Sequence, residues 1–311
     1  MKTHVRIGTR GSQLALWQAN HIKSCIENAF PDTRVEIITI KTTGDRITDR
    51  PLAAVGGKGL FVKEIETALM EGRIDLAVHS MKDMPGELPP GLVIGAIPER
   101  ENPFDVMISG RDNVLADYPQ GARIGTSSLR RGSQLKHARP DLEIRSIRGN
   151  LDTRLRKLKS GEYDAIVLAA AGLRRLGQEN EITEYLDETT MVPAVGQGAL
   201  CIETRENDPE MAPFMDALDH GPTRICVQGE RAFLRQIEGS CHIPVACFGK
   251  IREDDTVLLT AVVASEDGQE IIKETITTPA ERVETGGREL AERLLDNGGR
   301  RILENLNSHD S

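Results

Sequence analysis

The chain of 311 residues is 39% hydrophobic and 3% aromatic, and its formal net charge at pH 7 is −9. This length and apolar content are sufficient for two or three domains with buried cores. The few aromatic residues and the negative charge argue against a protein that binds nucleic acid by stacking or through a general basic surface.

Five scattered cysteines form neither a CxxC pair nor a metal-ligand spacing; they are Cys25, Cys201, Cys226, Cys241 and Cys247. We therefore predict no metal site and a reducing, cytoplasmic location. The chain opens on a polar segment and contains no apolar run of membrane-spanning length. We accordingly expect no secretory signal and no membrane association.

Strands and helices alternate in the first 100 residues, which is typical of parallel βαβ units. Apolar periodicity predicts strands over 5–7, 35–40 and 74–79 and helices over 15–26 and 61–70. Residues 42–59 form a polar, glycine-bearing loop, whose Lys58 either reaches a ligand or is an ordinary exposed lysine.

Lys82 and Asp83 follow directly on the third predicted strand. Ligands of open α/β sheets gather at the carboxyl ends of strands, so both side chains are well placed for a site. An aspartate two residues before Pro85 is also typical of a simple turn.

The segment Ile7–Leu14 (IGTRGSQL) recurs as Ile124–Leu135 (IGTSSLRRGSQL). Each copy is typical of a strand that ends in a hydroxyl-rich loop and opens a helix, where backbone N–H groups and the helix dipole attract anions. Arg130 and Arg131 fall in the first helical turn, which disfavours cations, so the second copy predicts a reserved anion site. An ordinary Ser or Thr cap beside two solvated arginines would explain the same pattern.

Basic residues concentrate between Ala122 and Arg175, where ten arginines and three lysines stand against five acidic residues. This segment has a net charge of +8, which leaves −17 for the remainder of the chain. Such an island in an acidic protein favours a local anion site.

Two crossings divide the chain, at the prolines of 98–103 and at 191–198. Residues 161–168 mirror 72–79 in helix stop, aspartate and buried strand, so we predict two similar βαβ lobes that face each other across a ligand cleft. The predicted boundaries are 1–98 with 199–218 for the first lobe, 103–192 for the second and 220–311 for a C-terminal domain.

The C-terminal domain is predicted as α+β with a three-stranded antiparallel sheet. A helix over 223–237 precedes strands over 245–251, 257–264 and 270–276, with a hairpin at Asp267-Gly268 and a last helix that ends at Gly298-Gly299. Between the first helix and the first strand lies Gly239-Ser240-Cys241. Cys241 is either an inert loop thiol or an attachment point, because thiolate is the strongest nucleophile among ordinary side chains.

The motifs together resemble the porphobilinogen deaminase (hydroxymethylbilane synthase) family across essentially the whole chain. The matching segments are 7–12, 55–61, 79–83, 125–131, 148–150, 193–198 and 239–241. The resemblance implies two lobes of periplasmic-binding-protein-like architecture flanking a cleft, a monomer, and a product that passes to a downstream cyclising synthase.

The resemblance also implies a transferase of tetrapyrrole (haem) biosynthesis. Four porphobilinogen molecules would be joined head to tail onto a dipyrromethane primer with loss of ammonia, and hydrolysis would then release hydroxymethylbilane. One primer per chain would be bound to Cys241 through a thioether. Asp83 would match the catalytic carboxylate, which holds pyrrole N–H groups and stabilises positive charge on azafulvene-like intermediates.

Arginines would dominate the implied binding residues, because their planar forks grip acetate and propionate groups. The primer contacts would be Cys241, Lys82, Asp83, Ser128, Arg130, Arg131, Arg148 and Gly149. The substrate contacts would be Arg10, Ser12, Lys58, Thr126, Ser127, Arg148, Arg154 and Arg175. Ala54 and Phe104 stand where basic residues are common in the family.

Other functions fit parts of the pattern. A non-catalytic two-lobed anion-binding protein would share the paired lobes, but the third domain with its loop thiol counts against it. A cysteine protease would need a paired histidine, and adjacent Cys241 and His242 point in opposite directions in an extended segment. Nucleic-acid binding by the basic island would give steeply salt-dependent affinity.

Overall fold

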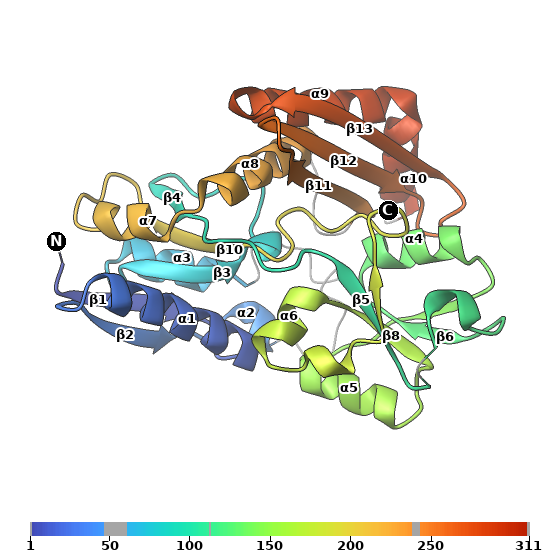
Figure 1. Cartoon of the computed structure of the whole chain (residues 1–311), viewed down its shortest axis with the longest axis horizontal. Coiled ribbons are helices and arrows are strands. Elements are labelled where there is room, and N and C mark those ends of the chain that lie inside the picture. Colours follow the sequence, from blue (N-terminus) through green and yellow to red (C-terminus); the bar gives the residue numbers. More distant parts are fainter. Residues whose placement is uncertain (1, 47–60, 112, 238–242, 310–311) are drawn as a thin grey trace. The chain divides into compact units, whose positions relative to one another are not determined.

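The computed structural model describes residues 2–46, 61–111, 113–237 and 243–309 (Figure 1). The chain divides into two compact units, Met1–Glu101 with Ala199–Arg224 and Asn102–Gly198 with Ile225–Ser311. Each unit is built from two segments of the chain, which leaves the first unit after Glu101 and re-enters it at Ala199. The finer three-domain boundaries stay a prediction.

The first unit contains a five-stranded mixed sheet with helices on both faces. The strand order is β2 (Arg34–Thr39), β1 (His4–Thr9), β3 (Leu76–Ser80), β10 (Leu200–Arg205) and β4 (Leu92–Ala96). β1 is parallel to β2 and β3, whereas β10 is antiparallel to both of its neighbours. Helices α1 (Gln13–Ala29) and α7 (Ala212–Leu218) pack on one face and α3 (Lys63–Met70) on the other.

The second unit begins with a lobe of the same topology. Its strand order is β7 (Glu143–Arg145), β6 (Arg123–Gly125), β8 (Ala165–Ala169), β5 (Asp105–Ser109) and β9 (Glu184–Leu186). β6 is parallel to its neighbours and β5 is antiparallel to both of its own. Helix α4 (Leu129–Ala138) packs on one face, and α5 (Leu151–Lys159) and α6 (Ala170–Arg175) pack on the other.

Each lobe contains an arginine–aspartate pair at the corresponding position. The backbone N of Arg6 donates to Asp75 Oδ2 at 2.8 Å, and the backbone N of Arg123 donates to Asp164 Oδ2 at 2.9 Å. The guanidinium of Arg6 also donates to Asp75, and that of Arg123 also donates to Asp164. The predicted mirror between 72–79 and 161–168 is therefore confirmed, down to this pairing.

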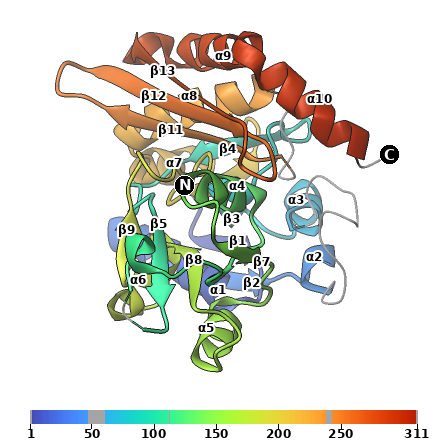
Figure 2. The ribbon, with the colours of Figure 1, turned by 90° about the vertical axis from the view of Figure 1, so that its right-hand side faces the viewer.

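The rest of the second unit is an α+β domain around an antiparallel sheet (Figures 1 and 2). Its elements are α8 (Gly221–Gln236), β11 (Val245–Ile251), β12 (Thr256–Ala264), β13 (Ile271–Pro279), α9 (Val283–Leu294) and α10 (Arg300–His309). The predicted hairpin is confirmed, with Gly268 at a φ of +71° and so close to the backbone of α4 that a Cβ would lie 2.4 Å from Ser133 O. The two mixed five-stranded sheets and this α+β domain, with its three-stranded antiparallel sheet, confirm the predicted fold class.

Three expectations from the sequence were wrong or incomplete. The last helix does not end the fold, because Gly298 only kinks the chain at a φ of +111° before α10. The predicted loop from residue 42 begins with a helical turn, α2 (Thr43–Arg46), where Asp45 accepts from Thr42 N and Oγ1. Strands β4, β5 and β9 were not predicted.

Candidate functional site

A hollow of about 70 Å³ lies at the carboxyl end of β3 in the first unit. Its lining includes Arg10, Ser12, Gln18, His79 and Asp83. Ser12 caps α1, because its Oγ accepts from Ala15 N at 3.3 Å. The structure thus brings three residues of the predicted site together in one lobe.

Asp83 is exposed at the end of a short 3-10 turn, Met81–Asp83, which follows β3. No described residue forms a hydrogen bond or ion pair with the Asp83 carboxylate. Lys82 lies beside it and is half-buried. The carboxylate is therefore available to a ligand, as a catalytic role requires.

The guanidinium of Arg10 already has partners within the first lobe. Its Nε donates to Asp45 Oδ1 at 3.0 Å, and its guanidinium lies 4.0 Å from the centre of the Phe61 ring. Burial alone would raise the pKa of Asp45, but Arg10 and Thr42 outweigh burial and lower it. Asp45 was not predicted, since it lies 35 residues away in the sequence.

The hydroxyl groups of the second loop hold the loop itself. Ser128 caps α4, with its Oγ accepting from Arg131 N at 3.4 Å. Thr126 Oγ1 accepts from Ser128 N at 3.2 Å, and Ser127 Oγ donates to Ile147 O at 2.6 Å. These side chains shape the start of α4 as predicted, while their ligand contacts stay a prediction.

Arg130 and Arg131 are not solvated, and a protein carboxylate already lies between them. Asp105, fully buried at the start of β5, accepts from Arg130 Nη1 at 2.7 Å and from Arg131 Nε at 2.8 Å. Burial would raise the pKa of Asp105, but the two guanidinium groups hold it well below its usual range. The sequence predicted that these two cations are either compensated by a ligand or solvated. Asp105 corrects that view, because it compensates them within the fold.

The second crossing, residues 191–198, is hydrogen-bonded to the same network. Gln197 Nε2 donates to Pro103 O at 2.7 Å and to Asp105 Oδ1 at 3.1 Å. Arg130 Nη1 donates to Val192 O, and Gly196 N donates to the buried carboxylate of Glu230 at 2.6 Å. The 193–198 motif therefore contacts the end of the first crossing at Pro103, the start of β5 and helix α8.

Arg154, another predicted binding residue, is half-buried on α5. Its Nε donates to Gly149 O at 2.9 Å, and no described carboxylate pairs with it. Burial and the charge of Arg131 lower the pKa of Arg154 to about 10. Two guanidinium groups that repel one another, with a cap at Asn150 and a positive φ of 114° at Gly149 beside them, are suited to an anion.

The remaining predicted residues have different outcomes. Arg148 is half-buried just before Gly149, and Arg175 is buried with its Nη2 donating to Gly198 O at 2.7 Å. Cys241, Lys58 and Ala54 lie outside the described residues. Phe104, which departs from the family, packs against Phe248 of the C-terminal domain with ring centroids 6.0 Å apart.

Local ion pairs cancel much of the charge of the basic island. Arg123, Arg139 and Arg145 pair with Asp164, Asp141 and Glu143 inside the segment, while Lys159 and Arg174 pair with Glu181 and Glu179 beyond it. The net charge of +8 already includes the three acidic partners inside the segment, so it is the outside carboxylates of Asp105, Glu179 and Glu181 that reduce it, from +8 to +5. Arg154 takes part in none of these ion pairs.

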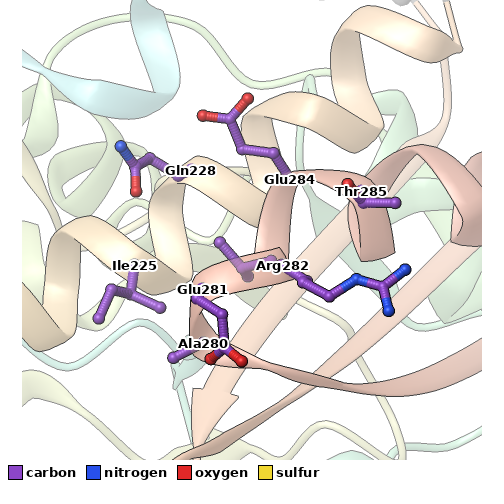
Figure 3. A pocket seen from close by; sticks show the side chains of 8 residues that line it. Ile225, Gln228, Ala280, Glu281, Arg282, Glu284 and Thr285 are labelled. Atoms are coloured by element: carbon purple, nitrogen blue, oxygen red, sulfur yellow. The ribbon is translucent and has the colours of Figure 1, made fainter.

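A larger hollow, of about 540 Å³, lies between α8 and the start of α9 (Figure 3). Its charged lining consists of Glu281, Arg282 and Glu284. Two carboxylates against one guanidinium do not suit an anionic ligand, so size does not make it the site. Within the described ranges, no cluster of His, Cys, Asp and Glu could hold a metal ion, and no helix is long and apolar enough to cross a membrane.

Comparisons with known proteins agree with the motifs. The family model of the porphobilinogen deaminase dipyrromethane cofactor binding domain matches residues 5–213, and that of the porphobilinogen deaminase C-terminal domain matches 224–296. Porphobilinogen deaminases of Syntrophobacter fumaroxidans and Pelobacter propionicus are 50% and 52% identical to this chain, each over 97% of both proteins.

Among solved structures, an arginine-specific periplasmic binding protein of Salmonella typhimurium is 12% identical, with a TM-score of 0.37 over 69% of this chain and 91% of that one. The assignment therefore depends on the sequence matches, which span nearly the whole chain. The chain belongs to the porphobilinogen deaminase family.

Proposed function

We propose that Asp83 is the catalytic carboxylate and that Arg131, Arg148 and Arg154 hold the carboxylates of the primer and the growing chain. The reaction is that of the family, in which porphobilinogen molecules are joined on a dipyrromethane primer with loss of ammonia. When bound, the primer supplies the ring carbon to which the first porphobilinogen is joined. The observation that carries the proposal is the guanidinium of Arg154, which lies near Arg131 and is paired with no described carboxylate.

The donor set fits a ligand that carries several carboxylates. Each pyrrole ring of such a ligand bears an acetate and a propionate, and a carboxylate placed near Arg131 and Arg154 would relieve their repulsion. Asp105 fixes the Arg131 guanidinium through Nε, which leaves little conformational entropy to lose on binding. In the first lobe, Asp83 faces the hollow and is suited to stabilise the positive charge that develops as ammonia leaves.

Replacing Arg154 with Gln is expected to weaken ligand binding without loss of stability. The variant removes a half-buried cation that repels Arg131, so the Tm of the primer-free chain should stay the same or rise. The rate of primer assembly should fall about tenfold or more, because one charged contact to a carboxylate is lost. Arg156→Gln, at an exposed position of the same helix, is the matched control. A lower Tm with normal primer assembly would assign Arg154 to the fold instead.

Intact mass tests the attachment point. We expect the purified chain to exceed its calculated mass by two pyrrole units, and Cys241→Ser to remove the excess. Cys25→Ser, on α1, should retain it. An unchanged excess in the Cys241→Ser chain would place the primer elsewhere.

We further propose that the protein is a cytoplasmic monomer that passes hydroxymethylbilane to a downstream cyclising synthase. The absence of membrane-spanning helices within the described ranges is compatible with this location. Sedimentation of the primer-loaded chain at micromolar concentration tests the monomer, and a dimer mass would contradict it.

A further inference from the structure

Three titratable side chains are buried together on the α3 face of the first sheet. Glu66 on α3, His79 on β3 and Glu203 on β10 are 6%, 5% and 0% exposed. His79 Nε2 lies 3.0 Å from Glu203 Oε2. In the antiparallel register Glu203 stands opposite Ala77, so Glu203 and His79 are diagonal neighbours on one face.

Among the described residues, His79 is the one member of this cluster that can carry a positive charge against its two buried carboxylates. Glu66 Oε1 and Glu203 Oε1 have no hydrogen-bond partner there. A buried carboxylate without a cation retains its proton to higher pH. Burial and the charge of Glu203 raise the pKa of Glu66 to about 7, although His79 acts in the opposite direction.

The other charges on the elements that pack against α3 have partners of their own. These elements are β1, β3 and β10. Their charged groups pair as Arg6 with Asp75 just before β3, His4 with Glu36, and Arg205 with Asp208; on α3 itself Lys63 is exposed and Glu64 accepts from Thr43. Within the described residues, Glu66, His79 and Glu203 therefore face one another and not these pairs.

His79 belongs both to this cluster and to the lining of the hollow that contains Asp83. The next residue, Ser80, accepts from Gln18 Nε2 at 2.9 Å and leads into the turn that bears Asp83. Because Glu203 accepts from Nε2, the neutral imidazole keeps its lone pair on Nδ1. The cluster thus adjoins the hollow through His79.

The family's reaction releases a proton at every addition. One carbon–carbon bond forms, while one carbon–nitrogen and one carbon–hydrogen bond break. The electron pair of the carbon–nitrogen bond leaves with ammonia, and that of the carbon–hydrogen bond returns to the pyrrole ring. The proton must pass to a base, and finally to ammonia, which leaves as ammonium. Asp83 cannot keep this proton and still stabilise positive charge.

We propose that Glu66, His79 and Glu203 form a proton-accepting cluster that takes up the proton released at each addition and keeps Asp83 ionised. This inference rests on the proposed role of Asp83. His79 is the member at the hollow, and Glu66 and Glu203 are positioning residues that set its affinity for the proton. A general base is most effective when its pKa lies near the working pH, and the Glu66 carboxylate in this cluster has its pKa raised to about 7.

The pH dependence of kcat in the primer-loaded enzyme tests the proposal. In the unmodified enzyme, kcat should rise with pH through the neutral range. Glu66→Gln removes a negative neighbour, so the midpoint of this rise should move to lower pH by at least about half a unit. His79→Asn, which keeps a hydrogen bond to Glu203, should lower kcat at least about tenfold with little change in KM. Glu71→Gln, at the exposed end of α3, should leave the profile unchanged.

A second measurement does not depend on turnover. In the primer-free Cys241→Ser chain, Glu66 favours the folded state less as the pH rises from 4.5, the ordinary value for Glu, to about 7. Over this window the Tm should fall relative to that of the Cys241→Ser, Glu66→Gln chain, by a difference on the order of 5 °C. Equal Tm changes in the two chains would show that Glu66 does not hold a proton.

The outcomes separate this inference from the proposed function. If Asp83→Asn is inactive while Glu66→Gln and His79→Asn keep the normal profile and kcat, the cluster is overturned and the role of Asp83 stands. If Asp83→Asn is fully active, the proposed function is wrong, and the inference fails with it.

Discussion

Replacing Asp83 with Asn is expected to leave the protein folded and loaded with primer while lowering kcat at least about a hundredfold. The carboxylate is exposed and no described residue binds it, so the fold loses nothing when its charge is removed. The reaction loses the proposed role of this carboxylate, the stabilisation of positive charge as ammonia leaves. Ammonia release in a single turnover, together with the Tm and the intact mass, measures both effects.

Glu87→Gln is the matched control for Asp83, since Glu87 is exposed in the same connection between β3 and β4. Its kcat should stay normal. A normal kcat in Asp83→Asn would remove Asp83 from the catalytic residues. A loss of primer in that variant would instead make Asp83 a residue of primer assembly.

The repeated loops could be predicted from the sequence because their signals are local. The capping roles of Ser12 and Ser128 follow from a hydroxyl residue placed directly before a periodic segment. The helix stops at Gly72 and Gly161 follow from positive φ angles, which favour glycine. The repeat then predicted two lobes of one topology, and this was confirmed.

The compensating carboxylates could not be predicted, because their partners are distant in the sequence. Asp105 lies 25 residues before Arg130, at the start of a strand that gave no clear alternating pattern. The net charge between Ala122 and Arg175 therefore suggested that all of these basic side chains are available to a ligand. Only the packing shows that Asp105 compensates Arg131, while no carboxylate in the described part of the chain does so for Arg154.

Asp105→Asn is expected to have the largest effect on stability of any substitution considered, a loss of about 3–5 kcal/mol in the free energy of unfolding. Asparagine keeps the volume but leaves two buried guanidinium groups, on Arg130 and Arg131, without a counter-charge. Burial already lowers the pKa of Arg131 with Asp105 in place. Denaturant unfolding of the primer-free chain measures the loss, and Asp141→Asn, which breaks an outer pair with Arg139, should change it little.

A double substitution distinguishes charge compensation from lost hydrogen bonds. If an uncompensated charge is the main cost, Arg130→Met in the Asp105→Asn chain should recover part of the stability, because one of the two buried cations is then gone. If hydrogen bonds to Val192 and Asp105 are the main contribution of Arg130, the second substitution should destabilise further. Recovery of stability would show that Asp105 stabilises the fold chiefly by neutralising Arg130, because the double variant no longer contains that buried cation.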